Sequence, residues 1–261
     1  MTDTFTSDVS HKTALITGAG RRIGRALAES LGAAGWAVAI HYNGSKSDAE
    51  DAAATITANG GRAAALRADL ADPDALPKLV ARAVEAFGPI GCLINNASIF
   101  ERDDIATATA NSWDAHMNVN LRAPFLLSQA FANQLPGDAR GAIINIVDER
   151  VWHLTPHFTS YTVSKAGLWA LTQTMAMALA PRIRVNAIGP GPTLPSTRQS
   201  QAQFDAQCES MPLQRGTNPG EICTAAQFIL SAAAMTGQMI ALDGGQHLGW
   251  GQASNTFNPD E

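Results

Sequence analysis

The chain has 261 residues, of which 46% are hydrophobic and 16% are charged, and its formal net charge at pH 7 is -5. This length suits one large α/β domain with a sizeable buried core, and the composition is typical of a compact soluble protein. The negative charge and the lack of a dense Lys/Arg run argue against a nucleic-acid partner, and no apolar run reaches the roughly 18 residues that predict a membrane span.

The N-terminal stretch MTDTFTSDVSH is polar and lacks the apolar region of a signal peptide. We therefore expect residues 1–11 to form a flexible tail and residues 12–261 to form the folded domain. The cysteines are scattered, at Cys92, Cys208 and Cys223, which indicates ordinary thiols in a reducing compartment. Together these features predict a cytoplasmic protein.

Short apolar runs then alternate with longer segments rich in Ala and Leu. We predict strands at 13–18, 37–42, 63–68, 91–96, 142–147, 183–188 and 239–245, and helices at 22–35, 46–60, 73–87, 111–134 and 160–180. The alternation indicates βαβ units, and continuous apolar strands are typical of a parallel sheet covered on both faces. The sequence therefore predicts a single-domain α/β fold: a Rossmann-like, doubly wound parallel sheet of about seven strands with helices on both faces.

A glycine-rich turn, TGAGRRIG, connects the first predicted strand to the first helix. Gly18, Gly20 and Gly24 allow the backbone to approach a pyrophosphate, and the helix N-terminus offers free N–H groups to the anion. Arg21 and Arg22 oppose the helix dipole there, a cost that a bound anion would offset. We interpret the turn as a nucleotide site rather than an ordinary connection, and the two arginines as phosphate contacts rather than solvated side chains.

The end of the second predicted strand, HYNGS at 41–45, indicates which nucleotide binds. It has no Asp or Glu to bind a ribose 2′-hydroxyl, so the loop can accept a 2′-phosphate, which favours NADP(H). Asp69 and Asn95 stand at the ends of the next two strands, where ligands bind in such sheets. Asp69 is a candidate acceptor for the adenine amine, and Asn95 either pins loops together or serves turn chemistry.

Tyr161 and Lys165 lie four residues apart on the predicted helix 160–180 and therefore share one face. A free phenol has a pKa of about 10, and a nearby ammonium favours the phenolate, so we expect Lys165 to lower the pKa of Tyr161. Such a phenol can exchange a proton with a substrate near neutral pH. Because the pair follows the fifth strand of a chain with a nucleotide turn, we interpret it as catalytic.

Nearly the whole chain resembles a classical short-chain dehydrogenase/reductase. The matching pieces are TGAGRRIG, NNAS at 95–98, NVN at 118–120, YTVSK at 161–165 and PGPT at 190–193. The resemblance implies one Rossmann-like domain, a homotetramer and hydride transfer from NAD(P)H. It also implies that Tyr161 donates the proton, that Lys165 holds the ribose and tunes the phenol, and that Asn120 supports a water relay.

Two departures from the family pattern point to a subgroup. Arg22 stands where the turn usually has glycine, and Asp148 stands thirteen residues before Tyr161, where the family has its catalytic serine. Together with HYNGS, NNASIF and GPGPT, these residues resemble the pteridine reductases. That resemblance implies that Arg22 contacts both cofactor and pterin, and that Phe100 stacks on the pterin. It further implies that Ser98 lies beside both ligands and that Asp148 acts with Tyr161.

The resemblance also gives the full set of residues expected around NADPH. Gly44 stands where the subgroup can carry an arginine, so the phosphate contacts near this loop fall to Arg22 and Ser45. The expected set is Gly18, Gly20, Arg21, Arg22, Ile23, Gly24, His41, Tyr42, Asn43, Ser45, Asp69, Leu70, Asn96, Ala97, Ser98, Tyr161, Lys165, Pro190, Gly191 and Thr193.

The exchange of serine for Asp148 has a chemical consequence. A serine hydroxyl donates a hydrogen bond to a ketone oxygen, whereas an ionised carboxylate only accepts and would repel a developing alkoxide. A pterin offers ring N–H groups, a 2-amine and reducible C=N bonds, and a carboxylate can accept from those donors or relay a proton through Tyr161. We therefore predict an NADPH-dependent reductase of a dihydropterin or dihydrofolate type of substrate, with Tyr161, Lys165 and Asp148 delivering the proton.

Two other functions stay open on this sequence. A carbonyl reductase acting on a ketone or a 3-oxoacyl thioester has the same fold, although Asp148 and Phe100 argue against it. A catalytically silent NADP(H)-binding protein is disfavoured because Tyr161, Lys165 and Asn120 are intact. The corresponding alternatives for single residues are a solvated loop position for Asp148 and an ordinary core position for Phe100.

The remaining features concern the substrate pocket and its cover. Trp152 and His153 follow the aspartate and either line the substrate pocket or simply pack. Pro156 interrupts the spacing of His153 and His157, and no zinc-type pattern accompanies them, so we predict no metal site. The segment 190–220 is rich in Pro, Gly, Ser and Thr, and we expect it to form a mobile substrate loop.

Overall fold

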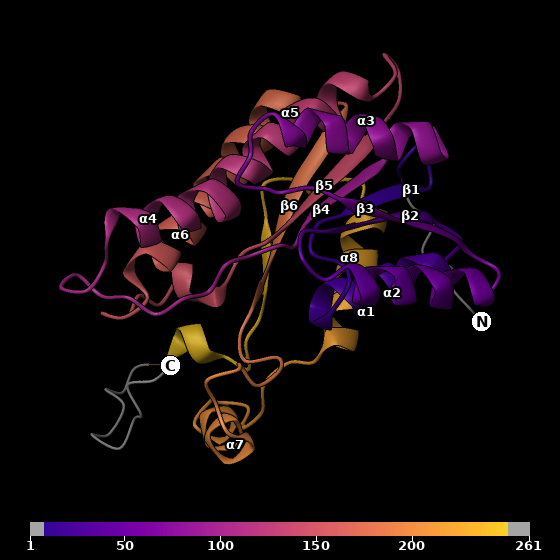
Figure 1. Ribbon diagram of the computed structural model, residues 1–261. Coiled ribbons are helices and arrows are strands. Elements are labelled where there is room, and N and C mark those ends of the chain that lie inside the picture. The colour runs from indigo at the N-terminus through magenta and orange to yellow at the C-terminus, as the bar shows by residue number, and fades with distance from the viewer. Residues whose placement is uncertain (1–7, 250–261) are drawn as a thin grey trace.

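The computed structural model describes residues 8–249, which form a seven-stranded parallel sheet between two layers of helices (Figure 1). The strand order is β3-β2-β1-β4-β5-β6-β7, so the chain runs outward from β1 in one direction and then crosses back to β4 and continues in the other. The predicted doubly wound sheet of about seven strands is therefore confirmed. The order reverses between β1 and β4, which is where ligands bind in such sheets.

The inner strands are buried along their whole length. The strands are β1 Thr13–Ile16, β2 Ala37–Tyr42, β3 Arg62–Arg67, β4 Cys92–Asn95, β5 Gly141–Ile146, β6 Ile183–Pro190 and β7 Met239–Leu242. Every residue of β1, β2, β4, β5 and β6 is buried, whereas the edge strands β3 and β7 are partly exposed. Helices on both faces explain why these strands are apolar at consecutive positions instead of alternating.

The two helix layers cover opposite faces of the sheet (Figure 1). One contains α1 Arg22–Ala33, α2 Lys46–Ala58 and α8 Pro219–Ser231, and the other contains α3 Ala75–Phe87, α4 Ala110–Met117, α5 Ala123–Gln134 and α6 Thr159–Leu179. Leu15 and Ile16 of β1 belong to different core clusters, because successive side chains of a strand point to opposite faces. Among the described residues, no helix is both long and apolar enough to cross a bilayer.

Three helical segments differ from the prediction. The helix predicted over 111–134 is interrupted by a π-helical turn at Asn118–Arg122, which separates α4 from α5. The region predicted as a loop over 190–220 contains α7 Gln201–Glu209, and α8 was not predicted. Ser200 and Asn218 form capping boxes at the starts of α7 and α8, and this spacing is a readable signal in the sequence. The short helices η2 Glu149–Val151 and η3 Gln246–Leu248 complete the fold.

The described part of the predicted tail is attached to the domain. The backbone N–H of Asp8 donates to the carbonyl of Leu230 at 3.2 Å, and that of Ser10 donates to the carbonyl of Arg140 at 3.0 Å. Arg140 Nη1 also lies 3.1 Å from an Asp8 carboxylate oxygen. These bonds attach the start of the described chain to the domain, and the flexibility expected for residues 1–11 stays a prediction. Residues 1–7 and 250–261 lie outside the described part of the chain.

Candidate functional site

The glycine turn between β1 and α1 packs against the end of β4. Gly18 has a φ of +62°, and a Cβ there would lie 3.0 Å from Ala97 Cα, so the position requires glycine. A Cβ on Gly24 would lie 2.3 Å from the carbonyl oxygen of Gly18, and one on Gly20 would lie 3.1 Å from Ala49 N. The N-terminus of α1 has neither a side-chain cap nor an acidic residue in its first turn. The turn therefore forms a cradle of backbone N–H groups that suits an anion.

The two arginines of the turn make different contacts. Arg21 Nε lies 2.9 Å from Asp48 Oδ2 in an exposed ion pair with α2. Arg22 has a φ of +51°, which is uncommon for a residue other than glycine. Its guanidinium donates to the carbonyls of Leu194, at 3.1 Å, and Pro195, at 3.0 Å. Arg22 thus joins the glycine turn to the segment that follows β6, and Ile23, beside it, is partly buried.

The end of β2 supports the turn from behind. His41 is 2% exposed; its Nδ1 accepts from the N–H of Gly18 at 3.0 Å, and its Nε2 donates to the carbonyl of Ala68 at 3.2 Å. Burial lowers the pKa of His41 to about 4, so the ring is neutral. The ring of Tyr42 packs in the core. The two side chains are thus held by the protein, and the cofactor contacts predicted for His41 and Tyr42 stay a prediction.

Other predicted cofactor residues stay closer to the surface at the ends of β2 and β3. Asn43 and Asp69 are exposed, and Ser45 is partly exposed and makes no capping hydrogen bond to α2. Asp69 Oδ1 accepts from the N–H of Ala71 at 2.9 Å. Leu70 is buried in the core. Asn43, Ser45 and Asp69 thus keep accessible polar groups, and their predicted contacts with the cofactor stay predictions.

Two asparagines fasten the end of β4. Asn96 Nδ2 donates to the carbonyls of Thr17, at 2.9 Å, and Gly18, at 3.2 Å, so it holds the glycine turn against the sheet. Asn95 Nδ2 donates to Asn145 Oδ1 at 2.8 Å and joins β4 to β5. Asn95 is buried, and its contact is between strands rather than between loops.

The π-helical turn places Asn120 between the nucleotide side and the catalytic helix. Its Nδ2 donates to the carbonyl of Ile99 at 2.9 Å and to Ser164 Oγ at 3.1 Å. Its Oδ1 accepts from the N–H of Ile99 at 2.8 Å and from the exposed hydroxyl of Ser98 at 3.3 Å. The fully buried side chain therefore clamps the segment after β4 to α6. The water relay implied for this residue stays a prediction.

The predicted catalytic residues meet where β5 ends and α6 begins. The Tyr161 hydroxyl donates to Asp148 Oδ2 at 2.6 Å, a short bond of the charge-assisted kind. The other Asp148 oxygen accepts from the N–H of Arg150 at 2.9 Å, which caps η2. Lys165 Nζ donates to the carbonyl of Ile146 at 2.8 Å and lies 5.7 Å from the centroid of the Tyr161 ring. Phenol, carboxylate and ammonium thus share one corner.

The electrostatics of this corner differ from the sequence-based expectation. Burial, followed by the negative charge of Asp148 and its hydrogen bond, raises the pKa of Tyr161 well above its ordinary value. Burial lowers the pKa of Lys165 to about 8, although Asp148 opposes that shift. The prediction that Lys165 lowers the phenol pKa is therefore wrong for this structure, because the phenol faces the carboxylate. At neutral pH the phenol therefore keeps its proton.

Glu149, next to the catalytic aspartate, is also buried. Its side chain is 4% exposed, and Oε2 finds no hydrogen-bond partner among the described residues. Burial, and secondly the charge of Asp148, raises the pKa of Glu149 to about 8. The carboxyl is therefore mostly protonated at neutral pH, and Asp148 remains the carboxylate that faces the phenol.

Phe100 lies beside Tyr161, within an aromatic group. Its ring stacks on that of Phe158, with centroids 4.5 Å apart and an interplanar angle of 14°, and it meets the Tyr161 ring edge-on at 4.6 Å. The Arg198 guanidinium lies 4.8 Å from the Phe100 centroid, and its Nη1 donates to the carbonyl of Phe100 at 3.1 Å. The predicted platform residue is thus brought to the catalytic corner.

Trp152 directly follows η2 in the sequence. It is 44% exposed and meets the rings of Trp169, at 6.3 Å, and His247, at 5.2 Å, edge-on. His247 lies in the segment after β7, and its Nδ1 is 2.6 Å from Asp243 Oδ2 in the same segment. The structure therefore places Trp152 in an aromatic cluster with Trp169 and His247, and its predicted contact with substrate stays a prediction.

The segment after β6 closes the site from the other edge. A Cβ on Gly191 would lie 2.7 Å from Asp243 Cα, and Thr193 Oγ1 donates to the carbonyl of Gly191 at 2.9 Å. Pro190 ends β6 and is buried. Sequence reasoning missed Arg198, because its partner Phe100 is 98 positions away and no local pattern marks the contact.

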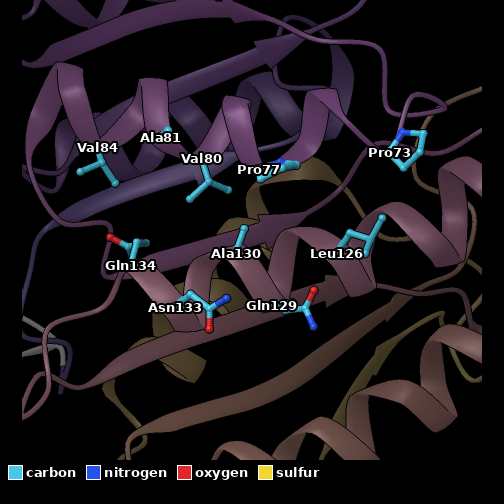
Figure 2. A pocket seen from close by; sticks show the side chains of 10 residues that line it. All are labelled: Pro73, Pro77, Val80, Ala81, Val84, Leu126, Gln129, Ala130, Asn133 and Gln134. Atoms are coloured by element: carbon cyan, nitrogen blue, oxygen red, sulfur yellow. The ribbon is translucent and has the colours of Figure 1, made fainter.

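A groove between α3 and α5 lies away from this corner (Figure 2). It has a volume of about 550 Å³, and its lining contains no titratable side chain. The lining residues are Pro73, Pro77, Val80, Ala81, Val84, Leu126, Gln129, Ala130, Asn133 and Gln134. No side chain that lines this groove is titratable, so the groove is not a candidate for acid–base chemistry.

The sequence matches a known family over most of its length. A profile of the family described as short chain dehydrogenase matches residues 12–206. The curated 3-oxoacyl-[acyl-carrier-protein] reductase FabG of Staphylococcus epidermidis is 33% identical over 243 residues, covering 91% of this chain and 100% of that protein. The FabG of Staphylococcus aureus is 34% identical over 244 residues, covering 91% of this chain and 98% of that protein.

Solved structures give a second set of similarities. FolM alternative dihydrofolate reductase 1 from Brucella canis, complexed with NADP, superposes with a TM-score of 0.91 at 44% identity, covering 96% of this chain and 99% of that one. FolM alternative dihydrofolate reductase 1 from Brucella suis, in complex with NADP, gives a TM-score of 0.89 at 46% identity, covering 92% of this chain and 96% of that one.

Proposed function

The chain belongs to the short-chain dehydrogenase family, and from that premise we propose that it is an NADPH-dependent reductase of a pteridine of the dihydropterin or dihydrofolate type. The observation that carries the proposal is the contact of 2.6 Å between the Tyr161 hydroxyl and Asp148 Oδ2. The FolM neighbours, which are named as alternative dihydrofolate reductases and are complexed with NADP, support both the substrate class and the cofactor.

The glycine turn fits a dinucleotide. Its closely packed glycines leave no room for a Cβ at Gly18 or Gly24, and the uncapped N-terminus of α1 suits a pyrophosphate. Ser45, at the end of the β2 loop, is the group we assign to the 2′-phosphate, with Arg22 close to the turn. NADPH, when bound, supplies the hydride, and the protein residues supply binding, orientation and the proton.

The phenol and the carboxylate divide the proton chemistry between them. Burial and Asp148 raise the pKa of Tyr161, so the phenol holds its proton at neutral pH and is a weak acid in the unliganded protein. The base that takes this proton is the ring nitrogen of the substrate, which becomes strongly basic as the C=N bond gains the electron pair of the hydride. The resulting phenolate beside a carboxylate is unfavourable, so the phenol has to regain a proton promptly; solvent supplies that proton, and the Asp148 carboxylate, which is hydrogen-bonded to the phenol, can relay it. Asp148 can also accept from the N–H groups of the heterocycle and orient it.

The same carboxylate disfavours a simple ketone. A ketone develops negative charge on its oxygen during reduction, and Asp148 would repel that charge, whereas nitrogen of a C=N bond is protonated as it gains electrons. One face of Phe100 stacks on Phe158, so a flat substrate would have to use the other face, where aromatic rings bind planar heterocycles by offset stacking. Its ring centroid lies 4.6 Å from that of Tyr161, close enough for a stacked heterocycle to reach the phenol.

A carbonyl reductase is the second candidate, and the curated relatives favour it. The two FabG proteins are named as 3-oxoacyl-[acyl-carrier-protein] reductases and align over nearly the whole domain. The departure at Asp148, in place of the serine that the family resemblance leads one to expect, is the feature that argues for pteridines instead.

We also propose that the chain assembles as a homotetramer, as the family resemblance implies. Phe125 on α5 and Met177 on α6 are apolar side chains with 45% and 76% exposure, and they lie in the helix layer where such an interface would form. Light scattering on the purified protein tests this, and a monomer at working concentration would refute it.

A substrate panel tests the proposed activity. Purified protein is mixed with NADPH and, in separate reactions, with a dihydropterin, dihydrofolate, a 3-oxoacyl thioester and a simple ketone, and NADPH absorbance is followed. We expect NADPH oxidation with the two pteridines at a kcat/KM well above that for either carbonyl. Oxidation with the thioester or ketone alone would replace the proposal by the second candidate, and parallel titrations with NADH check the cofactor.

A further inference from the structure

A buried polar network lies behind Tyr161 and is not used by the proposed chemistry. It joins Asp103, in the segment between β4 and α4, to Ser160 at the start of α6 and to His116 on α4. Ser160 and His116 are 0% exposed, and Asp103 is 4% exposed. A carboxylate and an imidazole are retained in such a place only when their polar atoms find partners, so the bonding of this network is informative.

Asp103 binds the first turn of α6 through three acceptors. Its Oδ1 accepts from the backbone N–H of Ser160 at 3.1 Å, and its Oδ2 accepts from the Ser160 hydroxyl. Its backbone carbonyl accepts from the N–H of Phe158 at 2.6 Å. Asp103 therefore binds the backbone N–H groups of Phe158 and Ser160, and Ser160 is 57 positions away from it in the sequence.

The helix α6 has no cap of its own that could replace Asp103. Phe158 occupies the N-cap position with a φ of +58°, has no capping side chain, and no acidic residue stands in the first turn. The first N–H groups of a helix have no acceptor within the helix, and a buried helix start without partners is costly. A carboxylate there also interacts favourably with the helix dipole. Asp103 supplies the cap that the local sequence lacks.

The contacts of His116, on the other side of the network, indicate which of its ring nitrogens carries a proton. Its Nε2 accepts from the backbone N–H of Glu101 at 3.2 Å, so that nitrogen carries no proton. The proton is then on Nδ1, which donates to the carbonyl of Ser112 at 3.0 Å and lies 2.7 Å from Ser160 Oγ. A neutral imidazole in this tautomer satisfies all three contacts. Its ring stands edge-on to that of Tyr161, with centroids 6.1 Å apart.

The network connects the catalytic phenol to the aromatic platform. Tyr161 directly follows Ser160, Phe100 precedes Asp103 in the same segment, and the rings of Tyr161 and Phe100 meet edge-on at 4.6 Å. We propose that Asp103, through Ser160 and His116, is a positioning residue that fixes the Tyr161 phenol relative to the face of Phe100. Because Ser160 and His116 are sealed from solvent, the Asp, Ser and His side chains do not form a hydrolytic site.

Asp103→Asn is the variant that breaks the network with the least change in shape. An amide offers one acceptor oxygen where Ser160 presents two donors, so one of the two bonds is lost. The neighbouring Asp104→Asn is the matched control, because the Asp104 carboxylate binds Thr107 and Ala106 within its own exposed loop. Both variants lose one negative charge, and they differ in whether α6 is affected.

The first readout observes the tyrosine directly and needs no substrate. The chain has 2 tyrosines, so protein labelled with ¹³C at the tyrosine Cζ gives one resonance from Tyr161 and one from Tyr42, which lies on β2 and serves as the internal reference. We expect Asp103→Asn to shift the Tyr161 resonance and to leave the Tyr42 resonance in place. Asp104→Asn should leave both unchanged.

The second readout separates positioning from simple stability, and it rests on the proposed function insofar as it uses the pteridine assay. We expect Asp103→Asn to lower kcat by about 10- to 100-fold, because small misplacements of catalytic groups cost this much, while the Kd for NADPH stays unchanged. Ser160→Ala keeps the backbone bond to Asp103 Oδ1 and is the second variant if Asp103→Asn does not fold. It should lower kcat in the same direction by less.

The outcomes decide the proposal in each case. A Tyr161 resonance that does not move in a folded Asp103→Asn or Ser160→Ala protein overturns it. So does a lower melting temperature with kcat per folded enzyme retained, since the network would then be structural only. If the unsubstituted enzyme reduces neither pteridines nor carbonyl compounds, the proposed function fails, and the resonance alone decides whether the network positions Tyr161.

Discussion

The nucleotide half and the substrate half of the site are built in different ways. At the ends of β1 and β2 the backbone sets the shape: Gly18 and Gly24 exclude side chains, and the buried ring of His41 binds main-chain groups. At the ends of β4 and β5 the shape depends on contacts between side chains, foremost that of Tyr161 with Asp148. A surface made by backbone serves any dinucleotide, whereas one made by side chains can acquire a new substrate through single substitutions.

The largest effect is expected from Tyr161→Phe, which removes the proton donor and leaves the nucleotide half intact. Turnover should fall by about 10²- to 10⁴-fold, the range that a general acid contributes. The Kd for NADPH, measured by quenching of protein fluorescence, should not change. If the variant kept most of its turnover, the proton would have to come from another group and the division between the two halves would not hold.

Two buried groups give the two halves opposite pH dependences of stability. The folded pKa of His41 is lowered from 6.5 to about 4, so the unfolded chain binds a proton first and stability falls as pH falls through that window. The folded pKa of Glu149 is raised from 4.5 to about 8, so the unfolded chain loses its proton first and stability falls as pH rises through that window. Between pH 6.5 and 8, Glu149 is the one of these two groups that makes stability depend on pH.

Glu149→Gln should therefore remove the loss of stability between pH 6.5 and 8. Near pH 8, we expect the free energy of unfolding of the variant to exceed that of the unsubstituted protein by on the order of a few kcal/mol. Each unit of pKa difference between the folded and unfolded states corresponds to about 1.4 kcal/mol. Urea unfolding at a series of pH values measures it. Parallel curves for the variant and the unsubstituted protein across this range would show that the carboxyl is not held protonated.

Gly18→Ala tests whether close approach defines the nucleotide half. The added Cβ would lie 3.0 Å from Ala97 Cα, at a φ of +62°. Gly60→Ala is the matched control, because Gly60 has a φ of +82° and nothing within 4 Å of the added Cβ. Both should lose about 1–2 kcal/mol of unfolding free energy from the left-handed backbone. Only Gly18→Ala should also weaken NADPH binding, and equal affinities in the two variants would contradict this account.

The smallest effect is expected from Arg22, which belongs to both halves. Arg22→Gly removes the side chain that binds the Leu194 and Pro195 carbonyls and also relieves the φ of +51°, whereas Arg22→Ala removes the side chain alone. Arg22→Gly should be about 1 kcal/mol more stable than Arg22→Ala. In both variants the amides of residues 194–200 should exchange faster with solvent, and unchanged exchange would show that Arg22 does not hold that segment.

The sequence predicted best what local pattern encodes. Continuous apolar runs such as AVAIHY predicted the buried parallel strands. The spacing of Asp148 and Tyr161 predicted two residues that the structure brings into contact. The capping boxes at Ser200 and Asn218 are equally local, so α7 and α8 were readable although they were not predicted.

Other features depend on contacts between distant residues and leave no local signal. The bond from Ser160 to Asp103 spans 57 positions, and nothing in either segment identifies its partner. The buried ring of His41 supports the glycine turn through two main-chain partners, and no local pattern marks those contacts. The expected effect of Lys165 on the phenol was wrong for the same reason: spacing gives proximity along a helix, whereas the pKa depends on which groups face each other.

The central claim is that the carboxylate beside the phenol selects a nitrogen heterocycle over a carbonyl. The most direct test is the ratio of kcat/KM for a dihydropterin to that for a ketone, measured with NADPH in the unsubstituted enzyme and in Asp148→Ser. The account predicts that the ratio falls on the order of 10²-fold in the variant, with the Kd for NADPH unchanged. A ratio that stays the same, with both proteins folded and active, would contradict it.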